Sequence, residues 1–94
     1  MQEVTFPIRV LHQLGIQQLF LSNAAGGINK NFKKDDLILI DDHSNLQGGS
    51  PLFGLKSIDY GGIFPDMSQP YSNNLNNSLI QTAKKLSVNL KKGV

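Results

Sequence analysis

Two short, uninterrupted apolar runs limit the folds open to this chain. The first is Leu19 to Leu21 and the second is Leu37 to Ile40. Apolar runs of this length, without alternating polar residues, are typical of strands that are covered on both faces, as in a parallel sheet. A helical pattern precedes the first run, and a helix followed by a strand suggests an α/β unit. The sequence therefore predicts an α/β fold.

The helical pattern before the first run covers residues 5 to 15, TFPIRVLHQLG. Thr5 is placed to cap its N-terminus, and Pro7 suits the first turn. Gly15 should stop the helix, with Ile16 packing back against it. We therefore expect a helix that runs from Thr5 to Gly15.

A longer helix is predicted from about Ser72 to Lys92. Apolar residues recur there every three or four positions, and lysines gather near the C-terminal end, where the helix dipole favours cations. We expect Gly93 to stop this helix. The apolar stripe consists of Leu75, Leu79, Ala83, Leu86 and Leu90.

Composition narrows the class of protein. A chain of 94 residues is one domain or part of one, and 39% hydrophobic with 17% charged residues fits a soluble globular protein. A net charge of +2 is too weak for a nucleic-acid footprint. Without cysteine there is neither a disulfide nor a thiolate metal site, and no apolar run approaches the roughly 18 to 20 residues of a membrane span. We expect no nucleic-acid or membrane partner and no secretion.

The first candidate site follows the first apolar run, within LFLSNAAGGIN, residues 19 to 29. Asn23, Ala24, Ala25, Gly26 and Gly27 would let a ligand approach the backbone closely, and successive N–H groups there can converge on a phosphate. The carboxyl end of a strand is also where α/β sheets usually bind ligands. A tight turn packed under a neighbouring element explains the small residues equally well. The residues alone leave both interpretations open.

The second candidate is Asp41, Asp42 and His43, at the end of the second run. Carboxylates and imidazole serve acid/base catalysis and metal binding alike. Adjacent residues at a strand end point in alternating directions, however, so the three cannot all face one ligand. A structural role, such as hydrogen bonding the loop that follows, is the favoured interpretation. We expect His12, which lies off the stripe formed by Val10, Leu11 and Leu14 in its helix, to be a partly exposed helix residue.

A long loop, Ser44 to Tyr71, separates the second run from the second helix and carries Phe64. Loops of this length are uncommon unless they are functional or covered by a partner. An exposed aromatic residue there can anchor in a partner's pocket or stack on a flat ligand, or it can tuck into its own core. The sequence does not separate these alternatives.

Five segments in this order resemble the trimeric class of purine nucleoside phosphorylases. The segments are VTFPIRVLHQLGI, LSNAAGGIN, DLILIDDHSN, SPLFG and FPDMS. Their order and spacing agree from about Gln2 to Val94, and NAAGG is the most specific piece, because methylthioadenosine phosphorylases differ there. The resemblance implies part of a mixed or parallel-sheet fold with flanking helices and a long interface loop.

The resemblance also implies phosphorolysis of purine ribonucleosides or deoxyribonucleosides to a free base and ribose or deoxyribose 1-phosphate. Inorganic phosphate is then a co-substrate, with no cofactor and no metal. The backbone at Ala24 would contribute to the phosphate site, and Asn23 to Gly27 would form a wall of the nucleoside pocket. Phe64 would cover the ribose held by a neighbouring subunit of a homotrimer, and the enzyme would be cytoplasmic.

By the same resemblance, residues 1–94 are a partial domain, truncated at both ends, whose other phosphate and purine ligands lie outside it. No catalytic residue is assigned within the segment, and we expect the chain alone to be inactive. Ile63 and Leu55 to Ile58 depart from the family pattern. The alternatives are a non-catalytic module that associates with a full-length phosphorylase, or a piece of a methylthioadenosine phosphorylase.

Overall fold

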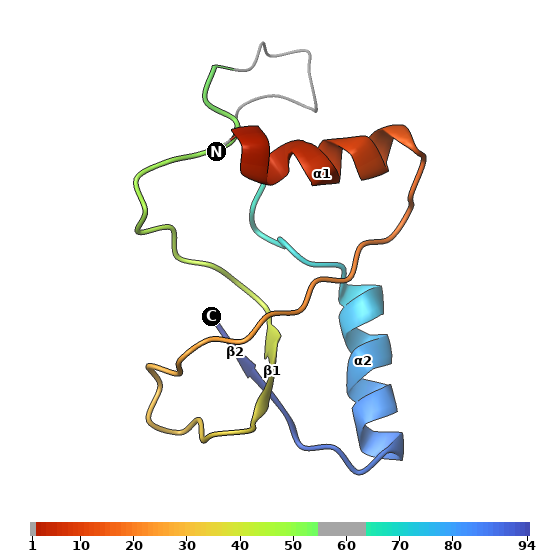
Figure 1. The fold of residues 1–94 in the computed structure, drawn as a ribbon. Helices are drawn as coiled ribbons and strands as arrows, with labels where there is room; N and C mark the ends of the chain where they lie inside the picture. Colours follow the sequence, from red (N-terminus) through yellow and green to blue (C-terminus); the bar gives the residue numbers. More distant parts are fainter. Residues whose placement is uncertain (1, 55–63) are drawn as a thin grey trace. The chain divides into compact units, whose positions relative to one another are not determined.

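The computed structural model describes residues 2–54 and 64–94 and contains two helices and two strands in these ranges, in the order α1, β1, α2, β2 (Figure 1). The chain divides into two compact units. Unit 1 comprises Met1–Ala25 and Leu46–Phe64, and unit 2 comprises Gly26–Asn45 and Pro65–Val94. Unit 1 contains α1, and unit 2 contains β1, α2 and β2.

Helix α1 spans Gln2–Gln13, so it begins three residues before the predicted start. The hydroxyl of Thr5 donates to the carbonyl of Gln2 at 3.2 Å, as threonine does inside a helix, and does not cap the N-terminus. Pro7 consequently lies inside the helix and not in its first turn, where it was predicted. The predicted cap was wrong because the hydroxyl has a backbone acceptor one turn back.

The end of α1 agrees with the prediction. Gly15 adopts a left-handed φ of +81°, a conformation that costs glycine little. The N–H of Gly15 donates to the carbonyl of His12 at 3.0 Å, and that of Ile16 donates to Leu11 at 3.3 Å. These two bonds form a Schellman motif, which satisfies carbonyls that the helix end would leave open.

Residues Leu19 to Leu21 do not form the predicted strand. Their side chains are exposed to 41%, 72% and 72% in chain order, so none of the three is buried. A strand requires a neighbour for its backbone hydrogen bonds, and in the described ranges β1 and β2 pair only with each other. The prediction from apolar content alone was wrong at this run.

Helix α2 spans Asn73–Lys85, with Ser72 as its N-cap accepting the N–H of Leu75 at 3.4 Å. It ends seven residues before the predicted end. Ser87 takes a left-handed φ of +54°, and the N–H groups of Ser87 and Val88 bond to Lys84 and Ala83, at 3.2 and 2.8 Å. A second Schellman motif therefore ends the helix, and Gly93 does not.

The predicted strand at Leu37–Ile40 is present as β1, and Leu90–Gly93 forms β2 beside it. The strands are parallel, in a register that opposes Leu37 to Leu90 and Ile40 to Gly93 (Figure 1). The N–H of Asp41 extends the ladder to the carbonyl of Gly93 at 3.0 Å. With α2 between the strands in sequence, unit 2 is a β–α–β arrangement, which confirms the predicted α/β class.

Side chains of the described residues are half-buried at most. None of the described residues is fully buried, and the half-buried positions of α2 include Leu75, Leu79 and Ala83 from the predicted stripe. Phe20, Leu21 and Phe64 are among the exposed apolar side chains. Neither described helix is long and apolar enough to cross a bilayer.

Candidate functional site

The predicted phosphate and nucleoside wall, Asn23 to Gly27, is an exposed segment without regular secondary structure. Asn23 to Ala25 end the first part of unit 1, and Gly26 and Gly27 open unit 2. A hydrogen-bonded turn follows it, in which the N–H of Asn31 donates to Asn29 Oδ1 at 2.9 Å and that of Phe32 to the Asn29 carbonyl at 3.0 Å. The small residues are therefore not part of the hydrogen-bonded turn described here, which starts after them at Asn29.

Neither Gly26 nor Gly27 has a conformation that requires glycine. Both φ angles lie outside the left-handed region. A Cβ on Gly26 would meet no atom within 4 Å, and one on Gly27 would make an ordinary 3.5 Å contact with Phe32 Cβ. The surroundings of the two glycines, as far as the structure describes them, hold no neighbouring element that would demand the absence of side chains.

An ion pair fixes the chain just beyond this segment. Lys91 Nζ in β2 lies 2.6 Å from Asp36 Oδ2 and also donates to the carbonyl of Asn31 at 2.9 Å. Asp36 Oδ2 accepts the N–H of Lys33 at 2.7 Å as well. The hydrogen bond from Lys91, followed by that from Lys33, lowers the pKa of Asp36. Residues 31 to 36 are thereby tied to the sheet of unit 2.

The predicted structural role of His43 is supported by two contacts. Its backbone N–H donates to Asp42 Oδ1 at 2.8 Å, and its ring Nε2 forms a hydrogen bond with the hydroxyl of Tyr71. The two rings lie 5.4 Å apart at an angle of 37°. Among the described residues, no three His, Cys, Asp or Glu side chains group as a metal site. His43 therefore bonds to the end of the long loop, as the sequence analysis favoured.

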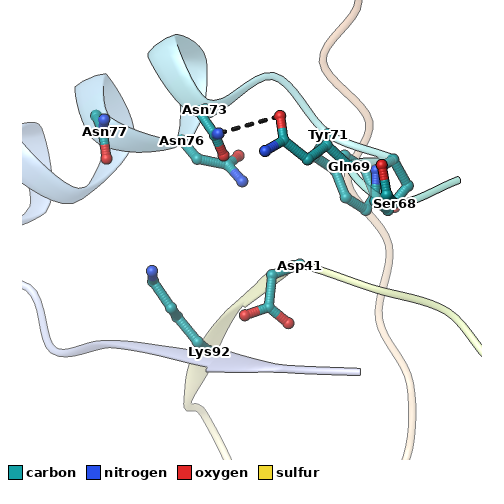
Figure 2. Close-up of a pocket in the computed structure, with 9 residues that line it drawn as sticks. Asp41, Ser68, Gln69, Tyr71, Asn73, Asn76, Asn77 and Lys92 are labelled. Atoms are coloured by element: carbon teal, nitrogen blue, oxygen red, sulfur yellow. Dashed lines mark hydrogen bonds between the residues drawn. The ribbon is translucent and has the colours of Figure 1, made fainter.

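A polar hollow of about 210 Å³ opens in unit 2 near this pair (Figure 2). Figure 2 shows Lys92 and Asp41 on the strand side of the hollow and asparagines of α2 on the other side. The amide of Asn73 donates to Gln69 Oε1 at 3.3 Å on its rim. The lining residues are Asp41, Ser68, Gln69, Pro70, Tyr71, Asn73, Asn76, Asn77 and Lys92. The predicted wall residues do not line this hollow.

Phe64, the predicted cover of a neighbouring ribose, is 90% exposed at the end of unit 1. This exposure argues against the alternative that the ring tucks into its own core. Asp66 Oδ1 accepts the N–H of Ser68 at 2.9 Å in the turn that follows, and this bond lowers the pKa of Asp66. The departures at Ile63 and Leu55 to Ile58 lie outside the described residues.

Neither Lys91 nor Tyr71 is among the predicted site residues. The sequence places Lys91 near the C-terminal end of the predicted helix, and its position on a strand beside Asp36 depends on where α2 ends. Tyr71 precedes the Ser72 cap, and its distance of 28 residues from His43 gave no local signal. Both residues act through partners that are distant in sequence.

Comparison with known proteins gives a consistent result. A family model described as the phosphorylase superfamily matches residues 1–94. Purine nucleoside phosphorylase 1 of Bacillus subtilis (strain 168) is 45% identical over 94 residues, which is 100% of this chain and 35% of the relative. Purine nucleoside phosphorylase 1 of Geobacillus stearothermophilus is 44% identical over 92 residues, which is 98% of this chain and 34% of the relative. Purine nucleoside phosphorylase of Mus musculus is 45% identical over 78 residues, which is 80% of this chain and 27% of the relative. The chain spans about a third of the length of these curated relatives.

Proposed function

The chain belongs to the phosphorylase superfamily, and we propose that it is part of an enzyme that cleaves purine nucleosides with inorganic phosphate. The products are a free purine base and ribose or deoxyribose 1-phosphate, as in purine salvage. The observation that carries the proposal is the 45% identity to a purine nucleoside phosphorylase across all 94 residues. Each relative described above is named a purine nucleoside phosphorylase, which favours this activity over that of a methylthioadenosine phosphorylase.

In this proposal the segment Asn23 to Gly27 is a wall of the nucleoside pocket, and the backbone at Ala24 contacts phosphate. Support comes from the exposed, open surroundings of Gly26. A Cβ there would have no atom within 4 Å, so a larger residue would fit, but the chain has glycine at this position. A ligand that approaches the backbone closely accounts for that choice, since only glycine leaves the backbone uncovered. Peptide N–H groups turned toward a phosphate would hold the anion while the bond to the base breaks.

Phe64 has a separate part in the proposal, as an aromatic cover for the ribose held by a neighbouring subunit of a homotrimer. Its 90% exposure leaves its ring face available to a second chain. An aromatic ring over a sugar excludes water and adds apolar contact. We place the enzyme in the cytoplasm, with purine nucleoside and phosphate as its small-molecule partners and no cofactor or metal.

We further propose that the 94 residues are a partial phosphorylase domain and that the isolated chain does not turn over nucleosides. A phosphorolysis site must stabilise charge on both the attacking anion and the departing base, which requires several preorganised groups at once. This chain supplies one wall of such a site. Purified chain mixed with inosine and phosphate should therefore release no hypoxanthine, as followed by ultraviolet absorbance.

The test of the proposed activity is a chimera in which this chain replaces the matching third of the Bacillus subtilis relative, to which it aligns over 94 residues. We expect phosphate-dependent release of hypoxanthine from inosine, and none without phosphate. The intact relative is the positive control. A soluble chimera with the same oligomeric state as the relative but no turnover of any purine nucleoside would refute the proposal.

A second candidate function is a non-catalytic module that associates with a full-length phosphorylase. The observation that favours it is the exposure of large apolar side chains, with none of the described residues fully buried. Apolar surface of this kind is typical of a surface that another polypeptide covers. Co-migration of the 94-residue chain with the intact Bacillus subtilis relative on a sizing column would support this candidate, and separate elution of two soluble species would reject it.

A further inference from the structure

The hydrogen bond between His43 and Tyr71 connects two firmly held points of unit 2. His43 follows β1 by three residues, and the intervening Asp41 is still hydrogen-bonded to β2 at Gly93. Tyr71 directly precedes Ser72, the N-cap of α2. The pair therefore joins the carboxyl end of the sheet to the start of the helix across 28 residues of sequence.

Two prolines restrict the backbone of the segment before Tyr71. Pro65 and Pro70 each have a fixed φ, and a proline also restricts the residue before it to extended conformations. Between them, the Asp66 carboxylate accepts the N–H of Ser68 at 2.9 Å and closes a local turn. The two prolines and the local turn therefore limit the backbone conformations open to the segment Pro65 to Tyr71.

The hydrogen bonds described for Ser68 and Gln69 are local. Ser68 bonds to Asp66, and Gln69 bonds to Asn73 four residues ahead. These contacts shape the segment Pro65 to Tyr71, but they do not attach it to the sheet. The bond from Tyr71 to His43 provides that attachment.

We propose that His43 and Tyr71 are a positioning pair that anchors the segment Pro65 to Tyr71 to the end of β1. Neither residue contacts substrate in this role. The consequence for catalysis rests on the proposed function, in which Phe64, the residue directly before this segment in the chain, covers the ribose of a nucleoside. Loss of the pair then weakens nucleoside binding and leaves the phosphate site and the chemical step intact.

The first test is ¹⁵N relaxation on the 94-residue chain, which does not depend on activity. Tyr71→Phe keeps the ring and removes the hydroxyl. We expect the order parameters of the Met67, Ser68 and Gln69 amides to fall from the roughly 0.85 of rigid backbone toward 0.6 or below. Amides in β1 and α2 should keep their values. Unchanged order parameters in the segment would overturn the proposal, and so would a fall that extends to Leu75, because Tyr71 would then act by starting the helix.

Rescue separates hydrogen bonding from packing. His43→Leu should reproduce the effect of Tyr71→Phe, whereas His43→Gln retains an amide able to bond to the tyrosine hydroxyl and should restore most of the order. The matched control is His12→Leu in α1, which should leave the segment unchanged. Equal loss of order in His43→Leu and His43→Gln would overturn the hydrogen-bonding role.

The second test uses the chimera described above. Tyr71→Phe should raise the KM for inosine by up to about tenfold, the scale of one aromatic contact, with kcat and the KM for phosphate unchanged. An active chimera whose inosine KM does not respond would overturn the link to Phe64. A soluble chimera with the oligomeric state of the relative but no turnover of any purine nucleoside would refute the proposed function, while the relaxation result would still decide whether the pair anchors the segment.

Discussion

The phenyl ring of Phe32 lies directly over the backbone of Gly93 in β2. A Cβ built on Gly93 would come within 2.8 Å of Phe32 Cζ, a distance that real Cβ atoms essentially never show, and within 3.2 Å of Cε2. The ring also lies 6.0 Å from Lys91 Nζ. Glycine at 93 therefore serves packing, although the sequence analysis assigned it to the end of a helix.

Gly93→Ala should destabilise the two-stranded sheet by about 1 to 3 kcal/mol, because the ring must move to admit the methyl group. Amide hydrogen exchange of Asp41, whose N–H bonds to the Gly93 carbonyl, measures the opening of this ladder. In a Phe32→Ala background the same substitution should cost little. An equal cost in both backgrounds would show that the ring is not the cause.

Ser87→Gly should stabilise the end of α2 by about 0.5 to 1 kcal/mol, because Ser87 has a φ of +54° and glycine adopts this conformation without strain. The exchange rate of the Val88 amide, which bonds to Ala83, reports this motif. Ser78→Gly is the matched control. Ser78 lies inside the helix, so the same replacement there should destabilise by a similar amount. Destabilisation by Ser87→Gly would contradict the assignment of the helix end.

Acidification should release the contact between Asp36 and Lys91. The pKa of Asp36 is lowered from 3.8 by the hydrogen bonds from Lys91 and Lys33, so the stabilisation is present above pH 3.8 and is lost as the pH falls through the lower folded-state value. The amide proton shift of Lys33, which donates to Asp36 Oδ2, should follow this loss.

Two variants control that titration. Lys91→Met should raise the pH at which the Lys33 amide shift changes, toward the ordinary aspartate value. Lys92→Met changes the next residue of β2, whose side chain points to the other face of the strand, and should leave the titration in place. A titration that Lys91→Met does not move would contradict the proposed cause.

Gly26→Ala should leave the fold of the chain unchanged and impair catalysis. Its Cβ would meet nothing within 4 Å, so the spectra of the isolated chain should match those of the parent. In the chimera, a methyl group between the backbone and a ligand should lower kcat/KM by about tenfold or more. Full activity with an unchanged fold would remove the proposed wall from the ligand site.

Phe64→Ala should likewise leave the stability of the chain unchanged, because the side chain is 90% exposed. In the chimera we expect a higher KM for inosine, by about tenfold, with the KM for phosphate unaffected. Phe64→Leu retains apolar area without an aromatic face, so its KM for inosine should lie between those of the parent and Phe64→Ala. An increase in the KM for phosphate would contradict the proposed role of Phe64 as a cover for the ribose.

The sequence alone predicted the elements whose signals are local. The strand Leu37–Ile40 was found from its apolar run, and the stop at Gly15 from glycine's access to left-handed φ. The run Leu19 to Leu21 carries a similar apolar signal and forms no strand. Apolar content does not reveal whether a neighbouring strand is available for hydrogen bonding.

The second helix shows the same limit. Leu90 lies at helical spacing from Leu86, yet it belongs to β2, because a left-handed Ser87 ends α2 between them. A single leucine is compatible with both the helical and the strand period, so the stripe could not locate the boundary. The resulting strand places Lys91 beside Asp36, a contact that the predicted helix would not have made.

By itself the sequence determined the α/β class, the end of α1 and the approximate start of α2. Through its resemblance it also determined membership of the phosphorylase superfamily. These features could be predicted because capping residues, apolar periodicity and short motifs depend on residues that are close together in the sequence. Only the tertiary structure decided the β1–β2 register, the ion pair of Asp36 with Lys91, and the bond of His43 to Tyr71. These contacts join residues 28 to 55 positions apart, and their formation depends on how the intervening chain is folded.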